Sequence, residues 1–164
     1  MPGQQDYRRG SGGDSHGPGA SGGIHAVREA LKSTEHAEYF DGNGGILPAL
    51  LDAGAQKTAQ DLAEIPTTQI RRFFGQVSAI KRRLEMDRDK AITEGEIQAQ
   101  LAFLKASTAY AAGRDGKNLP VLRFMVRHAN TVRTRDDFSA FHRHFETVVA
   151  FHKVYGKDSE KKHD

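Results

Sequence analysis

Four arginines in one predicted helix are the residues of this chain best placed to do chemistry. They are Arg71, Arg72, Arg82 and Arg83. From residue 67 to residue 84, apolar side chains recur at the spacing of a helix with one buried face. At about 100° per residue, Arg71 and Arg82 lie at nearly the same angle around the helix axis, and Arg72 and Arg83 share a second angle. The members of each pair lie roughly 16 Å apart along the axis. A guanidinium stays charged and forks onto phosphate oxygens, so the pattern predicts a phosphate-binding face, the alternative being a solvated helix surface.

The basic residues of the chain are concentrated around this helix. Residues 66–135 hold 14 Lys and Arg against 6 Asp and Glu, a balance of +8, which leaves 10 against 15 in the rest of the chain. Such a block indicates an anionic partner, nucleic acid first. The further candidate contacts are Lys105, Arg114, Arg123 and Arg127. The last two are four residues apart and share a helix face. Arg114 follows Tyr110 by four residues, so it can stack on the ring.

The histidines and acidic residues form no recognisable catalytic or metal-binding motif. There are eight histidines and no cysteine. His142 and His144 are two residues apart, so on a helix they do not face each other. His152 falls within the apolar stripe of the last predicted helix, where a buried imidazole needs a hydrogen-bond partner. We therefore predict no catalytic residue, no metal site and no cofactor, although the sequence leaves open an active site assembled from residues far apart in the chain.

Hydrophobic periodicity predicts an all-α fold, a compact bundle of about five helices in residues 46–156. The expected helices cover residues 47–62 with an interruption near Gly54, 67–86, a third from 91 or 95 to 112, 120–129 and 134–155. Thr134 and Asp137 have the spacing of a capping box, and residues 157–164 form a charged C-terminal tail. No apolar run approaches the roughly 18 residues of a membrane helix, and no secretion signal is present, so we expect a cytoplasmic protein.

The N-terminal part of the chain has a different composition. Residues 1–45 contain 11 of the 17 glycines. Such a segment buries too little apolar surface to offset the entropy of ordering it, so we expect a flexible tail. Within it, Ile24, Val27 and Leu31 keep a helical spacing. This spacing predicts a transient helix, with a short docking helix near residues 24–32 as the alternative.

Three segments, taken in order, resemble the small-subunit family of type III-A CRISPR effector complexes, the Csm small subunit. Residues 67–74, TTQIRRFF, are similar to the family's TTxxIR helix start. Lys105 together with residues 110–114, YAAGR, is similar to its K…AYaaGR segment. The last helix, from Phe141 to Gly156, is similar to its F…vvAyHKyyG ending. The resemblance covers residues 47–156.

The resemblance implies a helical protein without enzymatic activity. Family members stack as copies along the inner filament of the complex, beside the repeated backbone subunits and the large subunit. They hold target RNA against the guide RNA, mostly through its phosphate backbone. The motif positions imply RNA contact at Arg71, Arg72, Lys105 and Arg114, whereas Arg82, Arg83, Arg123 and Arg127 are assigned to RNA by charge alone. Two other functions stay open: a DNA-binding helix-turn-helix regulator and, less compatible with the residues present, a metal-dependent nuclease.

Overall fold

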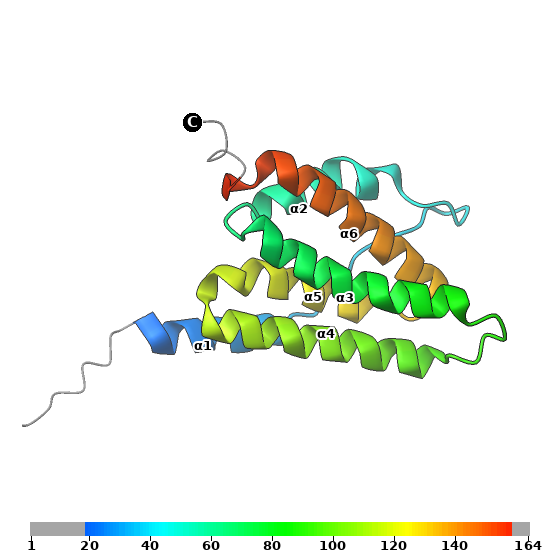
Figure 1. Ribbon diagram of the computed structural model, residues 1–164, viewed down its shortest axis with the longest axis horizontal. Coiled ribbons are helices and arrows are strands. Elements are labelled where there is room, and N and C mark those ends of the chain that lie inside the picture. The colour runs from blue at the N-terminus through cyan, green and yellow to red at the C-terminus, as the bar shows by residue number, and fades with distance from the viewer. Residues whose placement is uncertain (1–18, 159–164) are drawn as a thin grey trace, which may run out of the picture.

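The computed structural model describes residues 19–158, with side chains described from residue 23 (Figure 1). The α-helices are α1 (Gly19–Leu31), α2 (Ala53–Asp61), α3 (Thr67–Met86), α4 (Glu94–Arg114), α5 (Leu119–Thr131) and α6 (Arg135–Tyr155). Two short 3-10 helices, η1 (Pro48–Leu51) and η2 (Gly116–Asn118), complete the set. The described residues contain no β-strand, only one isolated bridge between Phe40 and Ile46. The predicted all-α bundle is confirmed.

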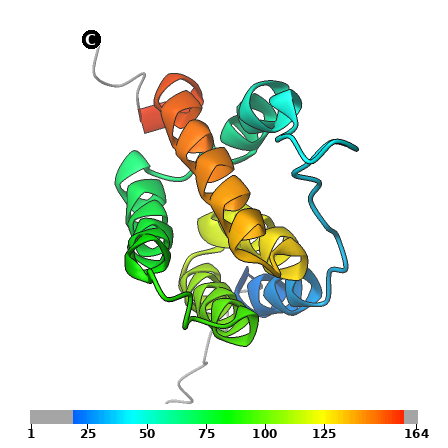
Figure 2. The same cartoon turned by 90° about the vertical axis from the view of Figure 1, so that its right-hand side faces the viewer.

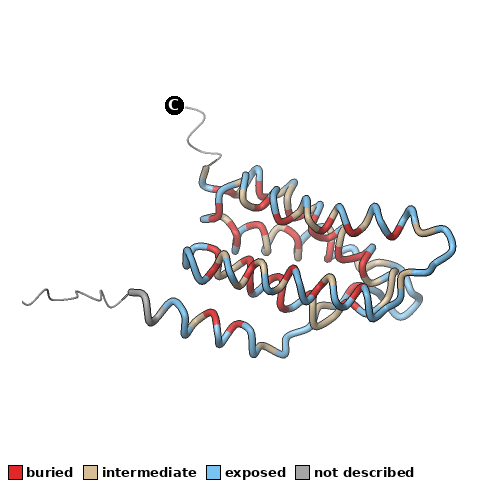
Figure 3. Tube along the Cα trace, turned by 60° about the horizontal axis from the view of Figure 1, so that its bottom comes forward, coloured by how far each residue is buried: buried red, intermediate tan, exposed pale blue. Residues whose placement is uncertain are grey.

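The helices form two groups that meet across an aromatic core. Helix α6 packs against α2 and α3, and α5 packs against α1 and α4 (Figure 2). The two groups are joined where the Phe124 ring of α5 lies 4.9 Å from the Phe145 ring and 6.0 Å from the Phe141 ring of α6, centroid to centroid. Buried positions recur on the inward side of each helix, as the periodicity of the sequence requires (Figure 3).

The boundaries of the helices follow from local chemistry, with one long-range exception. Helix α6 begins with the predicted capping box of Thr134 and Asp137. Helix α3 begins after Pro66 with no cap from its own threonines. Instead, the carboxylate of Asp158 accepts hydrogen bonds from the Thr67 backbone N–H at 2.8 Å and the Thr67 hydroxyl at 2.9 Å. These bonds lower the pKa of Asp158, and its charge complements the positive end of the α3 dipole.

The first expected helix is divided into η1 and α2, close to the predicted interruption. The break falls at Asp52, between the two elements. Gly54 lies just inside α2, where the two backbones come close: a Cβ at this position would lie 2.8 Å from the Ala49 carbonyl oxygen. A residue without a side chain is therefore needed for this contact.

Within residues 23–45, the side chains of Val27, Ala30 and Tyr39 are buried against the bundle, which differs from the flexible tail expected for residues 1–45. Residues 1–18 of that tail and 159–164 of the C-terminal tail lie outside the described residues. Val27 and Ala30 of α1 are buried against Leu122 and Val126 of α5. Figure 3 shows the buried positions of α1 on the side facing the bundle. The structure therefore contains the docking helix that the spacing of Ile24, Val27 and Leu31 allowed as the alternative to a transient helix, with Val27 and Ala30 as its buried side chains.

Three buried histidines tie the N-terminal part of the chain to the last two helices. His128 shares a 2.6 Å hydrogen bond with the Tyr39 hydroxyl. His144 bonds the Leu50 carbonyl at 2.6 Å, and His152 bonds the Leu62 carbonyl at 3.0 Å. The prediction that His152 is buried and hydrogen-bonded is confirmed. Burial lowers the pKa of His128 and His144, so both imidazoles are neutral in the folded protein at neutral pH.

Candidate nucleic-acid interface

The four arginines of α3 are all exposed. Their exposure follows from the helix stripe, because Ile70, Phe73, Val77 and other apolar residues occupy the inward face. Within the described residues, none of these arginines forms an ion pair with an acidic side chain. The neighbouring Lys81 differs, since its ammonium group pairs with Glu85 at 2.5 Å. Helix α3 therefore presents an unneutralised cationic surface along its exposed side.

This surface has two parts. By helical geometry, Arg71 and Arg82 lie nearly opposite the buried stripe and point away from the bundle. Arg83 lies on the flank toward α4, where it lines a groove of about 280 Å³ together with Ala99 and Gln100 of α4. Arg72 precedes Arg83 by eleven residues, about three turns, and so lies on the same flank.

The two basic residues of α4 lie on opposite flanks of that helix. Lys105 and Arg114 are nine residues apart, which is about 180° of rotation at 100° per residue. Lys105 is partly buried and shares a face with Ala109, which packs beside α1. Arg114 is exposed, and its Cζ lies 5.8 Å from the centroid of the Tyr110 ring, as expected from their spacing. Only Arg114 is therefore available to extend the α3 surface.

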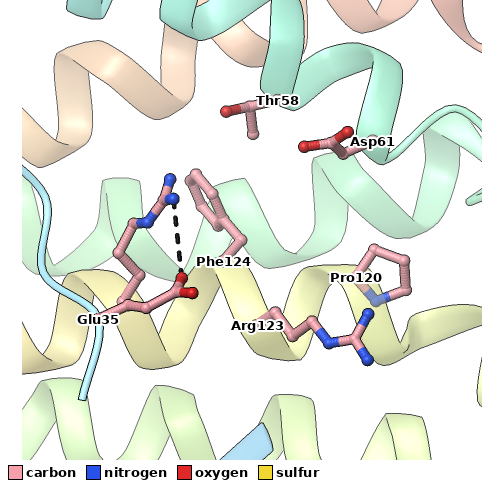
Figure 4. Close-up of a pocket in the computed structure, with 7 residues that line it drawn as sticks. Glu35, Thr58, Asp61, Pro120, Arg123 and Phe124 are labelled. Atoms are coloured by element: carbon pink, nitrogen blue, oxygen red, sulfur yellow. Dashed lines mark ion pairs between the residues drawn. The ribbon is translucent and has the colours of Figure 1, made fainter. Parts of the chain in front are cut away.

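The two remaining candidates, Arg123 and Arg127, line a separate pocket of about 390 Å³ (Figure 4). This pocket lies between α5, α2 and the segment before η1, and Figure 2 shows α2 and α3 on opposite sides of α6. Two carboxylates, Glu35 and Asp61, share the pocket with the arginines. Arg127 Nη2 lies 3.7 Å from Glu35 Oε2. The eight predicted residues are thus distributed over separate surfaces, and the charge of this second one is partly balanced.

The structure places a second exposed aromatic ring, Phe103, on the same helix as Tyr110. Phe103 is 69 % exposed and Tyr110 is 68 % exposed, both on α4. Tyr110 and Ala106 are both exposed and lie outside the buried stripe of this helix. The buried stripe runs instead through Ile97, Leu101, Leu104, Thr108 and Ala112. Phe103 directly precedes the buried Leu104, so it lies about 100° around the helix from that residue. This position relative to the buried stripe is the signal that could have marked Phe103 as exposed.

Two titratable side chains beside α3, His142 and Asp87, have structural partners. In residues 19–158, no group of three or more His, Asp or Glu side chains is arranged to hold a metal ion. His142 lies against α3, with its Nε2 3.1 Å from the Ser78 hydroxyl and its ring 5.3 Å from the Phe74 ring. Asp87 accepts hydrogen bonds from the backbone of the α3–α4 turn and from Arg135, which lowers its pKa. No helix of this described range has both the length and the apolar character to cross a lipid bilayer.

Comparison with known proteins agrees with the motifs of α3, α4 and α6. A protein-family model described as Csm2 type III-A matches residues 47–158. The match begins at residue 47, just before η1, so it includes every candidate RNA-binding residue and leaves α1 outside. No curated protein and no solved structure matches the chain. The matched range is more than half of the 164 residues, and the resemblance drawn from the three motifs is confirmed. The chain belongs to the Csm2 type III-A family.

Proposed function

We propose that this chain is the non-catalytic small subunit of a type III-A CRISPR interference complex in the cytoplasm and holds target RNA by sequence-independent phosphate contacts. Membership of the Csm2 family supports the place in the complex. The observation that carries the RNA contact is the row of four exposed arginines on α3, which has no acidic partner among the described residues. Base pairing with the guide would supply specificity, and the subunit would supply positive charge.

Within this proposal the α3 surface is the main RNA contact. Arg71 and Arg82 are free to follow a phosphate backbone on the outer face, and Arg114 extends the charge from α4. Arg123 and Arg127 would contact a different stretch of RNA, because they line a pocket away from α3. Lys105 belongs to the α1 flank of α4 and is the candidate least connected to the others. Backbone subunits, the large subunit and further copies of this chain would cover other faces.

A DNA-binding helix-turn-helix regulator is the second candidate function, and the N-terminus of α3 argues against it. Such a regulator inserts the N-terminal residues of a recognition helix into the major groove. At α3 this end is occupied by the Asp158 carboxylate, which bonds Thr67. A negative charge at that point would repel the phosphates flanking the groove. The arginines are also spread along the helix and not gathered at its start.

The direct test measures target-RNA affinity in the assembled complex and compares single-stranded RNA with duplex DNA for the isolated chain. We expect the complex with the Arg71→Gln, Arg82→Gln double variant to bind target RNA more weakly than the unmodified complex. The matched control changes Arg143 and Lys153, an exposed basic pair ten residues apart on α6, to Gln. This control should retain RNA affinity. Preference of the isolated chain for duplex DNA over single-stranded RNA, lost in the α3 variant, would instead support the regulator.

A further inference from the structure

Helix α4 has apolar side chains on two faces, and only one of them packs into the bundle. The outer face carries Ala99, Phe103, Ala106 and Tyr110. These residues follow one another at i, i+4, i+7 and i+11, so they form one stripe along the helix, here called the α4 outer stripe. All four residues are exposed, and the two aromatic residues, Phe103 and Tyr110, each have more than two thirds of their surface open to solvent. Large exposed apolar side chains aligned in this way mark an interaction surface.

Positive charge borders the α4 outer stripe. Ala99, its first member, lines the groove that also contains Arg83 of α3, so the stripe begins beside the Arg72 and Arg83 flank. At the other end the Arg114 guanidinium lies 5.8 Å from the Tyr110 ring. These three arginines pair with no acidic side chain in the range 23–158. One acidic residue, Glu96, reaches the groove, at the N-terminal end of α4.

We infer that the α4 outer stripe binds unpaired bases of single-stranded RNA, with Phe103 and Tyr110 each stacking on one base while Arg72, Arg83 and Arg114 contact neighbouring phosphates. This inference rests on the proposed function, because it requires RNA to lie along α3, and it concerns bases of that RNA that are not paired with the guide. Proteins that bind single strands without sequence preference combine a positively charged groove with aromatic side chains on which bases stack. Every base has a π-face, so this contact agrees with sequence-independent binding.

Two features favour RNA over an apolar protein surface at this stripe. An apolar protein surface would bury the rings but would leave three arginines without counter-charges, whereas a polynucleotide supplies rings and phosphates together. The spacing also fits. Phe103 and Tyr110 are seven residues apart, which is roughly 10.5 Å along the axis. Bases stacked at about 3.4 Å per nucleotide would cover this distance in about three steps, so the two rings would take bases that are not neighbours.

Tryptophan reporters test the stacking directly, because the chain contains no Trp. The full-length variants Tyr110→Trp and Phe103→Trp each introduce a single fluorophore into the stripe. The matched control is Val154→Trp, at a 72 % exposed apolar position of α6. At low ionic strength, we expect single-stranded oligouridine to quench the emission of both stripe variants and to leave the control unchanged. An oligonucleotide of the same length without bases should quench none of them.

Affinity measurements separate stacking from phosphate contact. Phe103→Leu and Tyr110→Leu keep an apolar side chain but remove the ring, and each should weaken oligouridine binding by about 5- to 150-fold with no change in its salt dependence. Phe103→Tyr should retain binding. The inference would be overturned if the Leu variants bound oligouridine as tightly as the unmodified chain, or if neither stripe reporter were quenched. Salt-dependent RNA binding, and with it the proposed function, would remain intact in that case. If the unmodified chain does not bind RNA at low ionic strength, both the inference and the proposed function would be contradicted. A blue shift of the stripe reporters on assembly without RNA would assign the stripe to a protein subunit and overturn the inference.

Discussion

The hydrogen bond between Tyr39 and His128 gives a sharp test of whether residues 32–45 belong to the folded domain. Tyr39 is 3 % exposed and His128 is 1 % exposed, and the Tyr39 hydroxyl lies 2.6 Å from His128 Nδ1. The two rings are stacked, with centroids 5.7 Å apart and planes 11° from parallel. Burial raises the pKa of Tyr39, so its hydroxyl stays protonated. The change Tyr39→Phe removes one oxygen atom and leaves the ring contact in place.

The expected cost of this change is about 1–3 kcal/mol of unfolding free energy, the cost of leaving a buried polar group without its partner. His128 Nε2 has no hydrogen-bond partner either, so the variant would bury an imidazole with both nitrogens unpaired. For a domain of this size the loss corresponds to a fall in melting temperature of roughly 3–10 °C. Urea unfolding followed by circular dichroism gives the free energy, provided that the m-value stays constant.

A double-mutant cycle with His128→Phe isolates the contact. The double variant should be less destabilised than the sum of the single variants by about 1 kcal/mol or more, because each single change orphans the group that the other removes. Tyr110→Phe is the matched control at an exposed tyrosine and should stay within about 0.5 kcal/mol of the unmodified protein. A cost for Tyr39→Phe as small as that of the control, with an additive cycle, would refute the docking of residues 32–45.

Three further predictions concern stability. Val27→Ala removes two buried carbons and should cost about 1–2 kcal/mol, whereas His25→Ala on the exposed side of α1 should cost less than about 0.5 kcal/mol; equal thermal shifts would mean that α1 does not pack. Burial lowers the pKa of His128 and His144 below the unfolded value of 6.5, so the folded state binds fewer protons than the unfolded state. The free energy of unfolding should therefore keep its full value above pH 6.5 and fall as the pH drops below 6.5. Identical urea midpoints at pH 7.5 and pH 5 would contradict this. Asp158→Asn keeps an acceptor but removes charge from the start of α3, and should lower thermal stability by about 0.3–1 kcal/mol; an unchanged or raised midpoint would argue against the cap.

The elements with strong local patterns could be predicted from the sequence. The buried stripe of α3, the capping box of Thr134 and the burial of His152 all follow from residues within a few positions of each other. Contacts across long separations could not be predicted. The Asp158 cap joins residues 91 positions apart, and the Tyr39–His128 bond joins residues 89 apart. Periodicity describes which face of a helix is apolar, but not which distant segment supplies its partners.

In the candidate site too, local features could be predicted from the sequence and long-range ones could not. Helical geometry was sufficient to place Arg71 with Arg82, and Arg72 with Arg83, on shared azimuths of α3. The separation of Lys105 from Arg114 could also have been read from their nine-residue spacing. The position of the Arg123 and Arg127 pocket required the tertiary structure, because it depends on how α2 and the segment before η1 lie against α5. Positive charge along a sequence therefore does not define one surface.

The salt dependence of target-RNA affinity in the assembled complex tests the central claim most directly. The slope of log affinity against log salt concentration is about −0.7 for each phosphate neutralised on a single strand. If Arg71 and Arg82 each contact one phosphate, changing both to Gln should make the slope shallower by roughly 1.4 and weaken all RNA sequences about equally. Circular dichroism should show that the helix persists, since Gln is nearly as good a helix former as Arg. Unchanged affinity and slope in a folded variant would contradict RNA contact by the outer face of α3.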